Sequence, residues 1–315
     1  MTAAGPSEPD AGALLARCTF PAPGTELVCG VSGGADSLAL LVLAVAAGCQ
    51  VTAVHVDHGL RVGSGAEAEV VCDAAAGLGA ACRVERLELA PGANLEARAR
   101  QARHLVLGPD AALGHTADDQ AETVLLNLLR GAAVDGLAGM RPGPRHPILA
   151  LRRADTEAVC RAHGLTWVVD PSNDDPVHRR NRVRHELVPL LASIADRDPV
   201  PVLVRQADLL RDVAAHLERE ADAIDPTDGR AVSDAPEVMA RTALRTWLRT
   251  ASPDGHPPDG AAVDRVLAVA RGEAVATDLG GGWRVARTAG RLRLEPPACA
   301  PVPSSGPPLD PQQGP

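Results

Sequence analysis

Glu26-Leu-Val-Cys-Gly-Val-Ser-Gly-Gly-Ala-Asp-Ser37 is the stretch that decides the fold. Residues 27–31 form an apolar run that predicts a short buried strand, 32–34 predict a tight turn, and 38–47 predict the helix that follows. A helix N-terminus offers unpaired N–H groups and a partial positive charge, and glycine lets an oxygen approach the backbone closely. The segment therefore predicts an anion site at a strand-to-helix turn.

A nucleotide phosphate is the anion that this turn favours. The residues expected to bind it are Ser32, Gly33, Gly34, Ala35, Asp36 and Ser37. A carboxylate beside a phosphate is tolerated when a divalent cation lies between them, so Asp36 predicts bound Mg²⁺. The chain contains no lysine, which excludes a Walker A loop and a Schiff-base cofactor site. A purely structural Gly-Gly turn is the alternative, for which Ser, Asp and Ser are poor choices.

The composition predicts a soluble, cytoplasmic protein with one large and one small domain. The chain has 315 residues, is 45% hydrophobic and carries a formal charge of −9, which argues against indiscriminate coating of nucleic acid. Its seven cysteines form no CxxC pair and are expected to be reduced core residues. No apolar stretch is long enough to span a bilayer, so we expect no membrane partner.

Strand and helix patterns alternate in the first half, which predicts an α/β fold with a parallel sheet and helices on both faces. Further strands are expected at 51–56, 82–87 and 111–114, and further helices at 66–78 and 95–107. Ligands bind beyond the carboxyl ends of such strands. Asp57 and His58, which follow the second strand, are therefore expected beside the nucleotide, and three strand ends are expected to meet at one crevice.

An acidic helix follows the fourth expected strand. Thr116 and Asp119 form a capping-box pattern, and the helix is expected to end near Gly131. Asp119 and Glu122 are three residues apart and so share a face of this helix, although the helix dipole alone also favours acids in a first turn. Such a pair predicts either a second Mg²⁺ or a substrate ammonium group.

The second half contains a basic run and a smaller domain. Arg179, Arg180, Arg182 and Arg184 fit either a solvated helix face or contacts with phosphates. Helices are expected at 199–223, 236–250 and 261–271, a linker at 224–233 and a hairpin at 282–294. Arg241, Arg245 and Arg249 share one helical face and could meet a nucleic acid backbone. The expected organisation is a disordered segment 1–13, a catalytic domain 14–198, an α-rich accessory domain 199–295 and a disordered, Pro-rich tail 296–315.

Several segments together resemble the tRNA(Ile)-lysidine synthase family. Residues 32–37 are similar to the PP-loop of N-type ATP pyrophosphatases, the superfamily to which that family belongs. The other similar segments are His55-Val-Asp-His-Gly-Leu-Arg61, Asn94-Leu-Glu-Ala-Arg-Ala-Arg100, Gly114-His-Thr-Ala-Asp-Asp-Gln-Ala-Glu-Thr123, Arg130-Gly131, Asp170-Pro-Ser-Asn173 and Arg180-Asn-Arg-Val-Arg184. Their order and spacing extend over about residues 26–190.

The resemblance implies a two-step reaction on a tRNA with a CAU anticodon. ATP would first adenylylate C2 of the wobble cytidine, and free L-lysine would then displace AMP to give lysidine. The implied catalytic residues are Asp36, Asp119 and Glu122, with Asp36 binding Mg²⁺. Asp119 and Glu122 would hold the amines of lysine, and Arg100 or Arg103 its carboxylate. The arginines of the basic run and Arg245 would contact tRNA, and His58 and His115 are candidates for proton transfer.

Three alternatives remain open from the sequence. One is a related PP-loop enzyme that thiolates tRNA, although the paired or catalytic cysteines of such enzymes are missing here. Another is a small-molecule adenylating ligase such as an NAD or GMP synthetase, which has no need of the basic run. The third is a nucleotide sensor without chemistry, which would not need the acidic pair. A measurement of pyrophosphate release with and without tRNA separates these classes. A sensor would release no pyrophosphate, and a small-molecule ligase would not need tRNA for the release.

Overall fold

The computed structural model describes residues 11–57, 64–87, 95–169, 175–251 and 259–296. The chain divides into two compact units, residues 1–211 and 212–315, and each is described by itself. Helix α10 (Val200–Ala221) contains the boundary between them. The two ends that we expected to be disordered lie outside the described residues, except that 11–13 begin helix α1 (Ala11–Leu15) and Pro296 is described.

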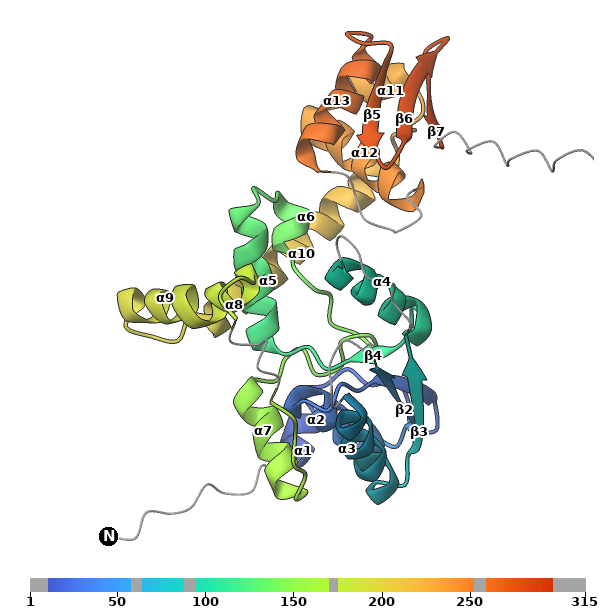
Figure 1. Cartoon of the computed structure of the whole chain (residues 1–315). Helices are drawn as coiled ribbons and strands as arrows, with labels where there is room; N and C mark the ends of the chain where they lie inside the picture. Colours follow the sequence, from blue (N-terminus) through green and yellow to red (C-terminus); the bar gives the residue numbers. More distant parts are fainter. Residues whose placement is uncertain (1–10, 58–63, 88–94, 170–174, 252–258, 297–315) are drawn as a thin grey trace, which may run out of the picture. The chain divides into compact units, whose positions relative to one another are not determined.

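The first unit is built on a four-stranded parallel sheet, which confirms the predicted α/β fold (Figure 1). The strands are β1 (Glu26–Gly30), β2 (Gln50–Asp57), β3 (Ala81–Arg86) and β4 (Ala112–Leu113), in the order β3-β2-β1-β4. The chain moves outward from β1 to β3 and then returns to place β4 on the other side of β1. The carboxyl ends of β1 and β4 therefore form a topological switch point, where ligands bind in sheets of this kind.

Helices cover both faces of this sheet, as predicted. Helices α2 (Ala35–Ala46) and α3 (Ser64–Gly77) pack on one face, where Cys29 of β1 and Ala53 of β2 are fully buried with Leu38 and Leu41. Helix α4 (Leu95–Leu107) packs on the other face. Side chains alternate between the faces, so both sides of the central strands are apolar. This packing holds the turn between β1 and α2 on a rigid support.

One expectation about the cysteines was wrong, because Cys72 and Cys82 form a disulfide between α3 and β3. The two Cα atoms are 5.3 Å apart, a separation that packing of α3 against its neighbouring strand produces and that sequence spacing does not reveal. The free cysteines of the described residues are Cys18, Cys29, Cys49 and Cys160. Burial raises the pKa of the Cys29 thiol to about 12, which makes it an inert core residue, as expected.

Reduction of this disulfide is expected to destabilise the first unit by about 2–3 kcal/mol, because the bond closes a short loop of the unfolded chain. The melting temperature measured with dithiothreitol should fall by roughly 5–10 °C, and Cys72→Ser should show the same loss without reductant. Cys18→Ser is the control, since Cys18 has no disulfide partner. Equal melting temperatures with and without reductant would contradict the prediction.

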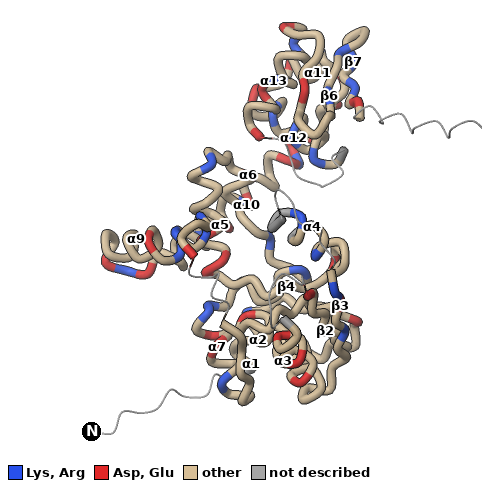
Figure 2. Tube along the Cα trace, in the orientation of Figure 1, with Lys and Arg blue, Asp and Glu red and all other residues tan. Residues whose placement is uncertain are grey.

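The remaining helices of the first unit follow β4. They are α5 (Ala117–Leu129), α6 (Val134–Leu137), α7 (Arg153–Ala162), α8 (Arg179–Arg182), a π-helical turn (Val183–Leu187) and α9 (Val188–Ala195). The capping box of α5 is confirmed, since the Thr116 N–H and hydroxyl both donate to Asp119 at 2.9 Å. Gly131 follows the helix with φ +75°, as a helix end requires. Helices α5 and α8 pack against each other, so an acidic and a basic segment meet there (Figure 2).

The second unit combines helices with a small antiparallel sheet. Its elements are α11 (Gly229–Asp234), α12 (Glu237–Ala251), α13 (Gly260–Arg271), β5 (Ala276–Gly280), β6 (Trp283–Thr288) and β7 (Arg291–Glu295). The expected hairpin is confirmed as β6 and β7, with Ala289 and Gly290 at positive φ in its turn. The expected linker at 224–233 was wrong from residue 229 onward, because Asp228 caps the short helix α11 there. Strand β5 was not predicted.

None of the helices in the described part of the chain combines the length and the apolar character needed to cross a membrane.

Candidate active site

The turn between β1 and α2 has the shape of an anion cradle. Gly33 has φ +87°, a conformation that residues with a Cβ rarely adopt. The Ser37 hydroxyl accepts a hydrogen bond from the Ser32 N–H at 3.1 Å and donates one to the Gly34 carbonyl at 2.9 Å. The Val168 N–H donates to the Gly33 carbonyl at 3.0 Å, so a second segment braces the turn. The N–H groups at the start of α2 are thereby held in place, in the arrangement that helix N-termini offer to anions.

Gly114, at the end of β4, lets that strand approach the start of α2. A Cβ atom at this position would lie 2.8 Å from the carbonyl oxygen of Asp36 and 2.9 Å from its carbonyl carbon. Both are backbone atoms, which have little freedom to move away. The absence of a side chain at Gly114 therefore sets the distance between the two strand ends that border the switch point.

Gly114→Ala is expected to displace the backbone of Asp36 and to cost about 1–3 kcal/mol of stability, as overpacking usually does. We expect the rate of tRNA-dependent pyrophosphate release from ATP to fall together with the stability. Gly77→Ala is the matched control, since a Cβ there meets no atom within 4 Å. Melting curves and pyrophosphate release for both variants check the prediction, and wild-type behaviour of Gly114→Ala would refute it.

A cavity of about 630 Å³ opens at these strand ends, so the expected crevice is present. Its lining includes most of the turn of residues 32–37, which we call the phosphate turn. It also includes Asp57 at the end of β2 and His115 and Asp119 after β4. Arg103 of α4 also lines it. His58 and the segment 170–173 lie outside the described residues, and so does the side chain of Arg100. This volume accommodates a nucleotide together with a small substrate.

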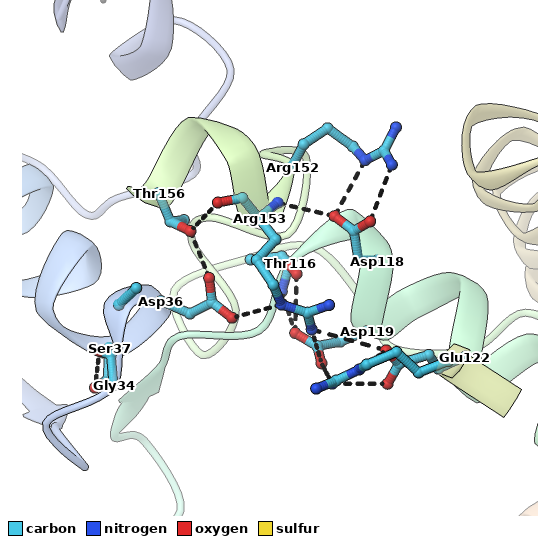
Figure 3. Close-up of polar contacts among 12 residues, drawn as sticks. Gly34, Asp36, Ser37, Thr116, Asp118, Asp119, Glu122, Arg152, Arg153 and Thr156 are labelled. Carbon is cyan, nitrogen blue, oxygen red and sulfur yellow. Dashed lines mark hydrogen bonds and ion pairs between the residues drawn. The ribbon is translucent and has the colours of Figure 1, made fainter. Parts of the chain in front are cut away.

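Asp36 lies at the start of α2 and lines the cavity (Figure 3). Its carboxylate accepts a hydrogen bond from the Thr156 hydroxyl, and its Oδ2 is 3.5 Å from Arg153 Nε. Burial raises the pKa of Asp36, against the opposing effects of Thr156 and Arg153. Among the described residues, no group of three or more His, Cys, Asp and Glu could hold a metal ion. One carboxylate still fits Mg²⁺, which is usually bound by one or two carboxylates together with phosphates and water.

Asp118 has a structural role that sequence spacing does not reveal. Arg152 forms a fork on it, with Nε and Nη2 donating at 3.1 and 2.9 Å, and the Arg153 N–H donates to it at 2.8 Å. Burial raises the pKa of Asp118, but the bonds from Arg152 and Arg153 outweigh it and lower the pKa overall. Asp118 therefore anchors the first turn of α7 to α5.

Asp119 and Glu122 are brought together, as predicted, in a buried cluster with three arginines. Asp119 Oδ1 is 3.2 Å from Arg180 Nη2 and 3.3 Å from Arg153 Nη2. Burial raises the pKa of Asp119, but Arg180 and Arg153 outweigh it and lower the pKa overall. Glu122 is only 2% exposed and accepts hydrogen bonds of 2.7 Å from Nε of both Arg180 and Arg184. The cluster thus pairs buried carboxylates with guanidinium groups, as burial of charge requires.

The arginines expected to contact tRNA have different surroundings. Arg180 and Arg184 point to the acidic pair, whereas Arg179 and Arg182 are exposed, with Arg182 paired to Glu186 on its own helix turn. Arg245 is half-buried in α12, in the second unit. The flanking arginines of that helix face form ion pairs within the unit, Arg241 with Glu237 and Asp264, and Arg249 with Glu218. Their contacts with tRNA stay a prediction.

His115 is close to a second histidine that the sequence did not single out. The two Nδ1 atoms of His115 and His146 are 3.1 Å apart, so one ring donates to the other. Burial lowers the pKa of His146 to about 4, which keeps that ring neutral near pH 7. A role of His115 in proton transfer stays a prediction.

Arg153 is the cavity residue that sequence reasoning missed. Helix α7, which it begins, has an arginine at its N-cap instead of the Ser, Thr, Asp or Asn that marks a helix start. The available signal was Asp155, whose carboxylate accepts the Arg152 N–H at 2.9 Å in the manner of a capping box.

Comparisons with known proteins agree with this geometry. A family model described as "PP-loop domain" matches residues 10–191, which defines the chain as a PP-loop protein. It is 38% identical to a tRNA(Ile)-lysidine synthase of Nocardia farcinica, with 90% of this chain and 96% of the relative covered. It is 41% identical to that of Salinispora tropica, with 87% and 91% covered. The chain belongs to the tRNA(Ile)-lysidine synthase family.

A solved structure shares the fold. The U34-tRNA thiolase NcsA from Methanococcus maripaludis aligns with a TM-score of 0.51 at 16% identity, and the alignment covers 64% of this chain and 79% of that chain. The similarity confirms the PP-loop architecture. The family that the sequence resembles is thus shown by the curated relatives, and ATP is the nucleotide that the PP-loop domain uses.

Proposed function

We propose that the chain ligates free L-lysine to C2 of the wobble cytidine of tRNA(Ile) with a CAU anticodon. The C2 carbonyl oxygen attacks the α-phosphate of ATP, and pyrophosphate leaves with the electron pair of the broken bond. The ε-ammonium of lysine loses a proton to solvent, its nitrogen attacks C2, and AMP leaves with the electron pair of the broken C2–O bond. The observation that carries the proposal is that one cavity is lined both by the turn of residues 32–37 and by Asp119, with Glu122 beside it across Arg153, so both steps can act on the same base.

The phosphate turn is assigned to the first step. Residues 32–37 hold the phosphates that leave as pyrophosphate, and Asp57 lines the nucleotide part of the cavity. Asp36 binds Mg²⁺, which supplies charge neutralisation for the leaving group. The reaction then needs no covalent nucleophile from the protein, because the activated intermediate forms on the tRNA base. Catalysis is positioning and electrostatic stabilisation.

The acidic pair is assigned to lysine. Asp119 and Glu122 are carboxyl groups in a buried setting, where a charged amine gains more from a carboxylate than it does at the surface. Arg103 lines the same cavity and offers a guanidinium for the carboxylate of lysine. Arg100 is the other candidate for that contact, and its side chain lies outside the described residues.

The basic run and the second unit are assigned to tRNA. Arg179 and Arg182 are exposed on α8, beside the acidic pair, and can meet the phosphates next to the wobble base. Arg180, Arg184 and Arg245 complete the proposed set of tRNA contacts. A tRNA substrate supports a cytoplasmic location.

Incorporation of radiolabelled lysine tests the proposal directly. The substrate is a tRNA(Ile) transcript with a CAU anticodon, with ATP and Mg²⁺ present and methionine tRNA as the control. We expect labelling that requires ATP and is selective for the isoleucine tRNA. Pyrophosphate release from that tRNA without labelling would retain the PP-loop chemistry but replace lysine by sulfur or ammonia as the nucleophile. An absence of both would refute the proposal.

A further inference from the structure

Arg153 joins the two halves of the cavity (Figure 3). Its Nε is 3.5 Å from Asp36 Oδ2, and its Nη2 is 3.3 Å from Asp119 Oδ1 and 3.7 Å from Glu122 Oε1. One guanidinium therefore touches the carboxylate assigned to Mg²⁺ and both carboxylates assigned to lysine. Its backbone is fixed, because Asp118 accepts the Arg153 N–H and also pairs with Arg152.

The order of atoms along the proposed reaction places the α-phosphate beside this guanidinium. The pyrophosphate lies in the phosphate turn, the α-phosphorus is bonded to it, the C2 oxygen joins next, and the lysine nitrogen approaches C2 from the acidic pair. The α-phosphate must lie between the two groups of carboxylates, which is where Arg153 lies. Resting on the proposed function, we infer that Arg153 is a catalytic residue that binds the α-phosphate and stabilises its charge in both transfers.

The contact distances indicate that the Arg153 guanidinium is not held by a short hydrogen bond to any of the three carboxylates. Charge-assisted bonds from a guanidinium to a carboxylate are usually about 2.7–2.9 Å long. Arg180 and Arg184 already make such bonds to Glu122, each at 2.7 Å. The contacts of the Arg153 guanidinium with Asp36, Asp119 and Glu122 are longer, at 3.5, 3.3 and 3.7 Å. A planar fork that is held in place but not committed to a short bond can bind two phosphate oxygens.

The chemistry gives this guanidinium the same task twice. In the first transfer the bond from the C2 oxygen to phosphorus forms while the bond to pyrophosphate breaks. In the second, the C2–O bond breaks and AMP keeps the electron pair. Negative charge lies on the α-phosphate oxygens each time, and a guanidinium can donate hydrogen bonds to them in both steps. No other reactant is required for this role.

The test measures tRNA-dependent pyrophosphate release by Arg153→Ala and Arg153→Lys at saturating ATP. Loss of one preorganised donor to a transition-state oxygen typically costs about 10²–10³-fold in rate, which is the expected effect of Arg153→Ala. The dissociation constant of ATP should change by less than about fivefold, because the contact strengthens in the transition state. Arg153→Lys keeps the charge without the fork and should be intermediate.

Chemical rescue separates this role from a structural one. Added guanidinium ion, at concentrations that leave the wild type unaffected, should restore part of the rate of Arg153→Ala. Arg161→Ala is the matched control, since Arg161 lies on the same helix, is exposed and pairs with Glu157. Melting curves of all variants report whether each is folded.

The inference is overturned in either of two ways. Arg153→Ala could release pyrophosphate at a rate close to wild type, or it could lose rate and ATP affinity together without any rescue. If Arg153→Ala does not fold, Arg153→Lys decides the matter by its rate against its ATP affinity. Failure of the proposed function is distinguishable, because the wild type itself would then incorporate no lysine into tRNA(Ile), whether or not it released pyrophosphate.

Discussion

Asp36→Asn is expected to lower tRNA-dependent pyrophosphate release by about a thousandfold, which corresponds to about 4 kcal/mol of lost transition-state stabilisation. Asparagine keeps an oxygen that can accept the hydrogen bond from Thr156, so the start of α2 should keep its structure. It removes the negative charge that a Mg²⁺ ion needs beside the leaving pyrophosphate. Rate measurements at saturating ATP and increasing Mg²⁺ check this expectation.

Glu157→Gln is the control for Asp36→Asn. Glu157 also lines the cavity, but it belongs to α7 and not to the phosphate turn, and its carboxylate pairs with Arg161 on the same helix. The control should release pyrophosphate at the wild-type rate. Because burial raises the pKa of Asp36, the wild type should also lose Mg²⁺ at a higher pH than an exposed aspartate would. An Asp36→Asn variant with a near wild-type rate would remove Asp36 from the metal site.

The parallel sheet could be predicted because its strands are apolar runs at βαβ spacing. The runs 27–31, 51–56 and 82–87 match β1, β2 and β3 to within one or two residues at each end. The phosphate turn followed from chemistry, since glycine at positive φ and hydroxyls at a helix start have few other uses. The short strand β4 was predicted within 111–114, but α11, with six residues, and β5, with five, were missed. Elements this short contain too few residues to show a clear helical or strand period.

The acidic pair could be predicted in part, because helical spacing places Asp119 and Glu122 on one face. The same spacing did not separate Asp119 from Asp118. That difference comes from Arg152, thirty-four residues later, which pairs with Asp118 and directs it away from the cluster. Arg153 was not predictable for a related reason. Its position depends on how α7 packs on α2 and on the bonds that Arg152 and Arg153 make to Asp118 of α5, and no local pattern encodes those contacts.

Glu122→Gln is expected to weaken the use of lysine by roughly 10- to 100-fold, the range for a lost hydrogen bond to a charged group. Glu122 is buried and accepts hydrogen bonds of 2.7 Å from Arg180 and Arg184. The substitution therefore also removes the negative charge that pairs with these two guanidinium groups. Some loss of stability should accompany it. Adenylylation is assigned to the turn of residues 32–37 in the proposed function, so pyrophosphate release without lysine should change far less.

The measurement is the lysine concentration that gives half-maximal incorporation, at saturating ATP and tRNA, beside the rate of pyrophosphate release without lysine. Asp118→Asn is the matched control on the same helix. It removes the carboxylate that pairs with Arg152, so it should lower the melting temperature while the half-saturating lysine concentration changes little. An unchanged lysine requirement in Glu122→Gln would remove Glu122 from the lysine site. Equal effects on lysine use and pyrophosphate release would instead make Glu122 a support for the arginines that surround it.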